Sequence, residues 1–228
     1  MALNVVTKID GPIAVRNVIV SVSDKSGLER FIPALADTCP DIHFYSTGGT
    51  FAAIEKILGG KAASLLSQVS DYTGQPEMQG GLVKTLDFKI YLGLLSERYN
   101  DAHVADLART GAVNFDMVVV NLYPFRETVA KPDVTAETAR GNIDIGGPCM
   151  IRASAKNFIR IAAVVDPADY QKVADECRNS GGKLSLETRY KLACKAFAHT
   201  AQYDKAISEY LEKTAFADVK SAYPEIVV

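Results

Sequence analysis

The hydrophobic pattern of the chain alternates between short apolar runs rich in Val and Ile and longer stretches with helical spacing. The apolar runs lie at 17–22, 42–45, 115–121 and 160–165, and the first helical patterns lie at 27–36 and 51–58. Unbroken apolar runs are typical of strands buried on both faces, and strand–helix alternation is typical of a parallel sheet covered by helices. The pattern therefore predicts an α/β fold, an open three-layer sandwich with a mainly parallel sheet.

The C-terminal part of the chain has a different periodicity. From Ser185 onward, apolar residues recur at helical spacing, as at Leu186, Tyr190, Ala193 and Phe197. This pattern predicts one long or broken helical segment that packs on the sheet domain or on a partner subunit. We expect residues 1–184 to form the sheet domain and residues 185–228 to form a C-terminal helical extension.

Composition and charge exclude several classes of protein. The formal net charge is −2, without the basic excess of a nucleic-acid footprint, and no run approaches the roughly 18 apolar residues that span a bilayer. The N-terminus lacks the basic and apolar regions of a signal peptide, and the four cysteines have no metal-ligand spacing. We expect a cytoplasmic protein with no nucleic-acid or membrane partner and no metal.

Candidate chemistry lies in the loops after the strands, because ligands of open parallel sheets bind beyond the carboxyl ends of the strands. The segments SVSDKSG (21–27) and STGGT (46–50) each join a predicted strand to a predicted helix. Adjacent glycines allow a phosphate close to the backbone, and Thr47 and Thr50 can donate hydroxyl groups to it. The two segments predict a shared phosphate site, although Ser and Asp in the first segment could equally be helix N-caps.

Two later segments interrupt the alternation. The segment 71–85 contains many turn-forming residues and ends in Lys84 and Thr85, which is typical of a binding loop or of a plain connection. The segment 143–157 places Asp144 before a Gly-Gly-Pro turn that predicts a helix starting at Pro148.

Lys156 lies eight residues after Pro148, roughly 12 Å along a continuous helix. Asp144 and Lys156 of one chain should therefore flank different parts of a ligand, unless the helix breaks or Lys156 serves a neighbouring subunit. Taken alone, Lys156 could also be a solvated surface charge.

Six segments together resemble one family over about residues 17–212, in the family's order. They are SVSDKSG, STGGT, TGQPEMQGG followed by VKT, NLYPF, IDIGGPCMIRASAKN and LETRYKLACKAFAHTAQYDKAISEY. The chain resembles the IMP cyclohydrolase domain at the N-terminus of the bifunctional purine-biosynthesis protein that also carries AICAR formyltransferase. The resemblance implies a methylglyoxal-synthase-like fold, an intertwined homodimer and ring closure of formyl-AICAR ribonucleotide to IMP without a cofactor. A separately encoded formyltransferase would be a further partner.

The resemblance also implies a role for individual residues. The substrate, chiefly its phosphate, would be held by Ser23, Asp24, Lys25, Thr47, Gly48, Gly49 and Thr50. The base and its formyl group would be lined by Lys84, Thr85, Asn121, Tyr123, Asp144 and Ile145, and Lys156 would occupy the proton-transfer position. Asn121 and Lys156 are identified by the resemblance alone.

The reaction suits these residue types. The carboxamide nitrogen attacks the neighbouring formyl carbon of the same molecule and water leaves, so positioning can lower much of the barrier. We expect Asp144 to accept from the carboxamide nitrogen, and amides near Gly146 or the Tyr123 hydroxyl to stabilise the oxyanion. Lys84 and Lys156 would move protons, and two lysines in one pocket could lower each other's pKa.

The chain departs from the family pattern at one place. The family reads Gly-Gly-Arg-Val-Lys-Thr-Leu-His-Pro, whereas this chain has Leu82, Asp87 and Phe88 in place of the Arg, His and Pro, with Lys89 as a candidate compensating cation. Two alternatives stay open: a non-catalytic purine-nucleotide-binding or regulatory module of the same fold, and a phosphate-handling lyase such as methylglyoxal synthase.

Overall fold

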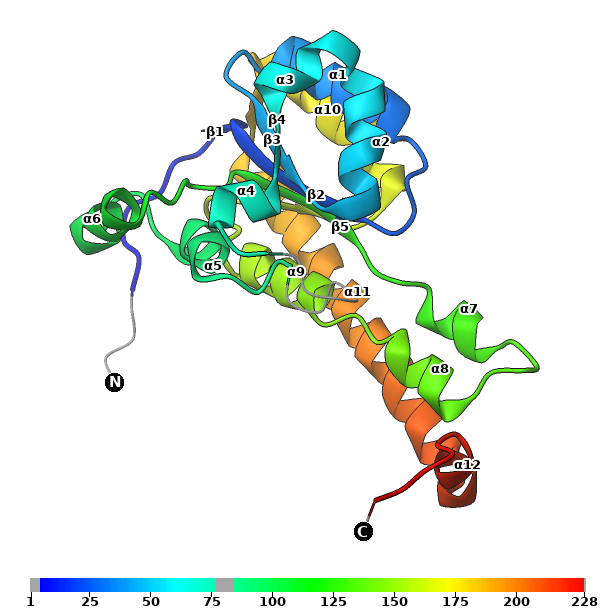
Figure 1. The fold of residues 1–228 in the computed structure, drawn as a ribbon. Helices are drawn as coiled ribbons and strands as arrows, with labels where there is room; N and C mark the ends of the chain where they lie inside the picture. Colours follow the sequence, from blue (N-terminus) through cyan, green and yellow to red (C-terminus); the bar gives the residue numbers. More distant parts are fainter. Residues whose placement is uncertain (1–4, 77–83, 228) are drawn as a thin grey trace.

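The computed structural model describes residues 5–76 and 84–227 and is built around a five-stranded sheet (Figure 1). All paired neighbours in this sheet run parallel, in the order β4-β3-β2-β5-β6. The strands are β2 (Asn17–Val22), β3 (His43–Ser46), β4 (Leu66–Gln68), β5 (Met117–Asn121) and β6 (Ala162–Val164). The predicted α/β class is confirmed.

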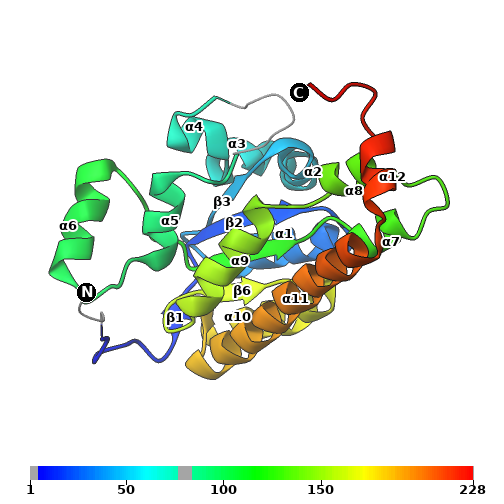
Figure 2. The same cartoon turned by 90° about the horizontal axis from the view of Figure 1, so that it is seen from below.

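Helices cover both faces of the sheet and complete the three layers (Figures 1 and 2). Successive residues of a strand point to opposite faces of the sheet, and each face packs into its own hydrophobic core. In β2, Val18 and Val20 belong to the first cluster of buried apolar residues and Ile19 belongs to the second. The first cluster includes side chains of α1 (Leu28–Thr38), α2 (Gly48–Leu58) and α10 (Tyr170–Ser180). The second includes side chains of α5 (Phe88–Leu95), α9 (Gly146–Lys156) and α11 (Leu186–Lys213).

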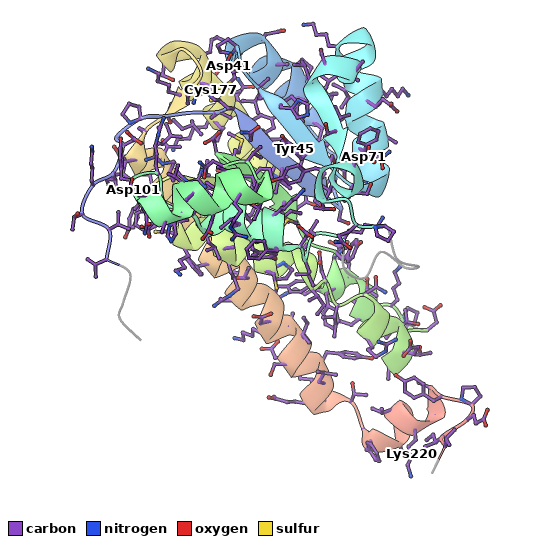
Figure 3. All side chains as sticks on the ribbon, turned by 60° about the vertical axis from the view of Figure 1, so that its left-hand side comes forward. Asp41, Tyr45, Asp71, Asp101, Cys177 and Lys220 are labelled. Atoms are coloured by element: carbon purple, nitrogen blue, oxygen red, sulfur yellow. The ribbon has the colours of Figure 1, made fainter. Side chains whose placement is uncertain are left out.

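The predicted C-terminal helix is present as α11, which is unbroken over 28 residues. One half of α11 contacts α9 and β6. Its other half reaches beyond the sheet, where α7 (Phe125–Val129) lies beside it and α8 (Ala136–Gly141) lies near its end (Figure 2). The last helix, α12 (Phe216–Ser221), follows it and carries Lys220 to the far end of the molecule (Figure 3).

The remaining elements are short. A two-stranded antiparallel pair joins β1 (Ile13–Ala14) to β7 (Lys183–Leu184). The others are η1 (Gly59–Lys61), α3 (Ala62–Leu65), α4 (Val69–Thr73), α6 (Asp101–Thr110) and η3 (Pro167–Asp169). The hydrophobic pattern predicted none of β1, β4 and β7, because each has only two or three residues and, unlike β6, was not marked by one of the longer apolar runs.

Several predicted boundaries were wrong. The helix after STGGT begins at Gly48 and not at Phe51, so both glycines lie in its first turn. The helix after Asp144 begins at Gly146 and not at Pro148. The segment 71–85 is not all loop, since its first three residues end α4, and residues 77–83 lie outside the described part of the chain.

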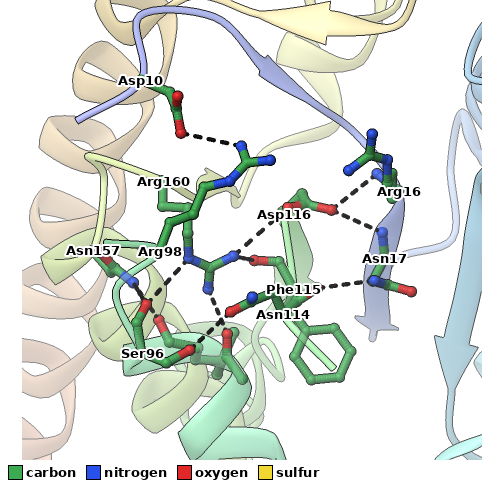
Figure 4. Close-up of polar contacts among 12 residues, drawn as sticks. Asp10, Arg16, Asn17, Ser96, Arg98, Asn114, Phe115, Asp116, Asn157 and Arg160 are labelled. Carbon is green, nitrogen blue, oxygen red and sulfur yellow. Dashed lines mark hydrogen bonds and ion pairs between the residues drawn. The ribbon is translucent and has the colours of Figure 1, made fainter. Parts of the chain in front are cut away.

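A buried arginine ties the sheet to the α5–α9 layer at the edge opposite the carboxyl ends of the strands (Figure 4). The guanidinium of Arg160 donates to the carbonyls of Ser96, Phe115 and Gly93 at 3.2, 2.7 and 2.5 Å, and its Nη1 lies 3.6 Å from Asp116 Oδ1. The Asp116 carboxylate also accepts from the backbone N–H groups of Arg16 and Asn17. Burial lowers the pKa of Arg160 to about 10, so the side chain is still charged at neutral pH.

The strand order places a topological switch point between β2 and β5. The chain moves from β2 to β3 and β4 on one side, and then returns to add β5 and β6 on the other. At such a point the loops that follow the two central strands diverge and leave a crevice for a ligand.

Candidate active site

A cavity of about 390 Å³ lies at this switch point, within the range of about 300–1,000 Å³ typical of small-molecule sites. The loops after β2, β3 and β5 and the N-terminus of α9 contribute its walls. Most residues implied by the resemblance line it: Ser23, Lys25, Thr47, Gly48, Gly49, Thr50, Lys84, Thr85, Asn121, Tyr123, Asp144, Ile145 and Gly146. Asp24 and Lys156 do not.

One end of the cavity is formed by the first turn of α2. Gly48 has φ +47°, which favours glycine, and the Nζ of Lys84 lies 3.3 Å from the position that a Cβ would occupy there. The Cε of Lys25 lies 4.0 Å from the corresponding position at Gly49. Two lysines therefore lie at a helix N-terminus whose first amides carry partial positive charge, an arrangement that favours an anion.

Thr50 lines this end, but its hydroxyl is already engaged. The side-chain oxygen donates to the carbonyl of Val22 at 3.0 Å and accepts from the Val22 N–H at 3.2 Å. The expectation that this hydroxyl donates to a phosphate is therefore wrong for this structure. Thr50 instead fixes α2 against the end of β2, and Thr47, the N-cap of α2, is the threonine left to face the ligand.

The loops after β2 and β5 are fastened to each other across the switch point. The amide of Asn121 accepts from the Asp24 N–H and donates to the Asp24 carbonyl, both at 2.8 Å. The Asp24 carboxylate turns away to accept from the N–H and hydroxyl of Ser26. Asp24 therefore lies outside the cavity. The two hydrogen bonds between the Asn121 side chain and the Asp24 backbone fix the position of the loops that form this part of the cavity wall.

Asp144 lines the cavity from the segment before α9. Its carboxylate accepts from the Gly147 N–H at 2.9 Å, within the first turn of α9. A Cβ on Gly147 would lie 2.6 Å both from Asp144 Oδ2 and from Leu122 Cδ2, so only glycine leaves room for the carboxylate. Burial raises the pKa of Asp144, and the hydrogen bond from Gly147 partly offsets this rise.

Gly146 has a similar constraint. A Cβ there would lie 2.5 Å from the Thr85 hydroxyl, so the segment that carries Lys84 and Thr85 approaches the start of α9 closely. Tyr123 and Ile145 line the same region with about half of their surface exposed, at 52% and 55%. Tyr123 and Ile145 therefore lie at a solvent-exposed part of the cavity wall, whereas Thr85 is buried.

Lys156 lies elsewhere. It is the last residue of α9, exposed, and ten residues from Gly146, which is about 15 Å along the helix axis. The structure therefore does not bring Lys156 together with Lys84 or Asp144 within one chain. The two lysines that it does bring to one helix N-terminus are Lys25 and Lys84.

The departures from the family pattern are only partly described. Leu82 lies outside the described residues. Asp87 is the N-cap of α5 and accepts from the Lys89 N–H at 2.8 Å, and Phe88 is exposed. The Lys89 ammonium donates to the Tyr72 carbonyl and does not line the cavity, so the expectation that Lys89 could compensate for the arginine is not supported.

Six further wall residues were not assigned a role from the sequence: Ser21, Val22, Gly141, Ile143, Gly147 and Met150. All but Gly141 lie within the segments 21–27 and 143–157 that the sequence singled out. Gly141, the last residue of α8, had no such signal in the sequence.

In residues 5–76 and 84–227 no group of three or more His, Cys, Asp and Glu side chains is placed to hold a metal ion. No helix within those same ranges is long and apolar enough to cross a bilayer.

Comparisons with known proteins agree with this fold. Family models match residues 27–149 as an MGS-like domain and residues 154–227 as AICARFT/IMPCHase bienzyme. The bifunctional purine biosynthesis protein PurH of Neisseria meningitidis serogroup C is 46% identical over 93% of the chain, and that of Ruminiclostridium cellulolyticum is 45% identical over 88%. These matches cover 39% and 37% of the relatives, so the chain spans about two fifths of their length.

A solved structure is also similar. The crystal structure of ForH has a TM-score of 0.70 at 29% identity, and the match covers 86% of this chain and 98% of ForH. With the parallel sheet and the cavity at its switch point, these matches show that the chain belongs to the MGS-like domain family and corresponds to the IMP cyclohydrolase domain of PurH.

Proposed function

We propose that this chain is an IMP cyclohydrolase that closes formyl-AICAR ribonucleotide to IMP with loss of water. One observation carries the proposal: the wall of a single cavity holds both a helix N-terminus with two lysines, which favours an anion, and the half-buried carboxylate of Asp144 from a different element. A nucleotide has a phosphate and a base with hydrogen-bonding groups, so a cavity with both features matches the substrate. The relatives named for purine biosynthesis support the same choice.

The proposed roles follow from where each group lies. The first turn of α2, with Lys25 and Thr47, binds the phosphate. Asp144 accepts a hydrogen bond from the carboxamide nitrogen and orients it toward the formyl carbon of the same molecule. The Gly147 amide is engaged with Asp144, so we assign oxyanion stabilisation to the Gly146 amide and the Tyr123 hydroxyl.

Proton transfer is assigned to Lys84 within the cavity and to Lys156 from a second subunit. As formyl-AICAR ribonucleotide becomes IMP, the carboxamide nitrogen and the formamide nitrogen each lose one proton, and both protons leave with the former formyl oxygen as water. The reaction therefore needs groups that accept protons from the nitrogens and donate protons to the oxygen. Lys84 lines the cavity beside the anion-binding turn and carries its ammonium group on a flexible side chain. A homodimer and a separately encoded formyltransferase that supplies the substrate are part of this proposal.

The test is an assay of ring closure with formyl-AICAR ribonucleotide, followed by the rise in absorbance as IMP forms. Asp144→Asn should lower kcat about 100-fold, since about 2.7 kcal/mol of transition-state stabilisation corresponds to that factor. Asp101→Asn is the matched control, because Asp101 is exposed on α6 (Figure 3) and does not line the cavity. No conversion by the wild type, together with tight IMP binding, would support the non-catalytic binding module instead.

A further inference from the structure

The segment that carries Asp144 is held from outside the cavity by one side chain of the C-terminal helix. The Asp144 N–H donates to the hydroxyl of Tyr203 at 2.8 Å, and this hydroxyl donates to the Asn142 carbonyl at 3.3 Å. A single oxygen thus bridges two backbone groups on either side of Ile143. Tyr203 lies on α11, 59 positions further along the chain, and is 9% exposed.

The two hydrogen bonds require a neutral Tyr203. Its hydroxyl accepts from Asp144 and donates to Asn142 at the same time, which a phenolate could not do. Burial raises the pKa of Tyr203, and its neighbours Asp144 and Asp204 raise it further, while the hydrogen bond from the Asp144 N–H lowers it. The hydroxyl therefore keeps its proton throughout the neutral range.

The ring of Tyr203 also contacts the other wall of the site. Its centroid lies 6.2 Å from that of Phe125, the first residue of α7, which closely follows Asn121 and Tyr123. Tyr210, two turns further along α11, contacts the same Phe125 ring at 5.9 Å. The helix α11 thus holds the loop after β5 through ring contacts and the Asp144 segment through the Tyr203 hydroxyl.

The orientation of Asp144 then depends on three contacts. The Gly147 N–H holds its carboxylate, the lack of a side chain at Gly147 leaves room for it beside Leu122, and Tyr203 holds its backbone. Removal of the Tyr203 hydroxyl would leave a partly buried N–H and a carbonyl without their partner, and such groups favour a shift of the segment toward water.

We propose that Tyr203 is a positioning residue of the cyclohydrolase, which fixes the backbone at Asp144 through its hydroxyl. The inference rests on the proposed function of Asp144, but the hydrogen bond is a property of the structure that can be tested without turnover. Tyr203 acts through Asp144 and does not line the cavity.

The test compares Tyr203→Phe with Tyr210→Phe. Both variants lose a hydroxyl from α11 and keep a ring against Phe125, but of these two tyrosines it is Tyr203 that forms hydrogen bonds to the 142–144 segment. We expect Tyr203→Phe to lower kcat roughly tenfold or more while KM changes by less than about threefold. The variant misaligns the Asp144 contact to the transition state but leaves the residues that bind the phosphate in place. Tyr210→Phe should keep wild-type kcat.

Two further measurements separate positioning from folding. If Tyr203 acts through Asp144, adding Tyr203→Phe to Asp144→Asn should lower kcat no further, whereas independent effects would multiply and overturn the proposal. Hydrogen exchange of the Asp144 amide should be about tenfold faster in Tyr203→Phe, with exchange in the β2 and β5 strands unchanged.

The exchange measurement also keeps the two proposals apart. A wild type that converts no substrate would contradict the proposed function, while slow exchange at Asp144 that depends on the Tyr203 hydroxyl would still support the positioning contact. Unchanged exchange in Tyr203→Phe, or an equal loss of kcat in Tyr210→Phe, would overturn the role of Tyr203.

Discussion

At the scale of single residues, the protonation of Asp144 sets a limit on the pH range of activity. Its pKa lies above the ordinary carboxyl value of 3.8, chiefly because burial disfavours the charged form. A role as hydrogen-bond acceptor requires the carboxylate. Activity should therefore be present at high pH and be lost as the pH falls through the raised pKa.

The measurement is the dependence of kcat/KM on pH between about 4 and 8. The wild type should show an acidic limb whose midpoint lies above 3.8, and Asp144→Asn should lack this limb in its residual activity. A limb that is identical in the two proteins would assign it to another group and contradict the role of Asp144.

The glycine that faces Asp144 is a second constraint at this scale. Gly147→Ala would place a Cβ 2.6 Å from Asp144 Oδ2 and Leu122 Cδ2, so one of these groups must move. We expect kcat to fall about tenfold or more, because the carboxylate is the group that can swing toward the cavity. A crystal structure of the variant should show it displaced.

Gly60→Ala serves as the control for this substitution. Gly60 is also a helical glycine, but a Cβ there meets nothing within 4 Å, so neither activity nor stability should fall. Wild-type kcat in Gly147→Ala would show that the site tolerates a displaced carboxylate.

At the scale of elements, Arg160 joins the end of α5, the start of β5 and the segment after α9. Its Nε and both Nη atoms donate to carbonyls of Ser96, Phe115 and Gly93, a fork that a lysine cannot reproduce. Arg160→Lys should lower the free energy of unfolding by about 2 kcal/mol or more, since buried carbonyls lose charged donors. Chemical denaturation monitored by circular dichroism measures this loss.

Arg98→Lys is the matched control, because Arg98 pairs with Asp10 at 3.1 Å and its side chain is 52% exposed. Exposed ion pairs contribute at most about 1 kcal/mol, so a small change is expected. Equal losses in the two variants would contradict a special role for the buried fork.

At the scale of the whole molecule, the position of Lys156 bears on the subunit arrangement. Within one chain it lies about 15 Å beyond Gly146 along α9, so a role in proton transfer requires a second copy that brings its own Lys156 to this cavity. Asp144→Asn would then alter a group that a subunit supplies to its own cavity, and Lys156→Ala would remove a group that it supplies to its partner's cavity.

Coexpression of these two variants tests the arrangement. In a mixed dimer one of the two sites carries both defects and the other is intact, so random pairing should restore roughly a quarter of wild-type activity per site. Lack of recovery, with mixed dimers demonstrated by mass spectrometry, would exclude a contribution of Lys156 to the partner's site.

The sequence alone determined the class of fold and the chemical character of the site. Buried strands of a parallel sheet need apolar residues on both faces, so their runs at 17–22 and 115–121 are visible without structural knowledge. The glycine- and hydroxyl-rich segment at 46–50 and the Asp-Ile-Gly-Gly segment at 144–147 are local patterns, and the order of six segments identified the family.

Only the tertiary structure decided which polar groups face the ligand. Thr47 and Thr50 are equivalent in the sequence, but the Thr50 hydroxyl meets the end of β2, because the register of β2 with β3 brings Val22 beside the first turn of α2. The bonds of Asn121 to Asp24 and of Tyr203 to Asp144 join positions 97 and 59 residues apart. Local periodicity carries no information on such pairs, since packing of distant elements creates them.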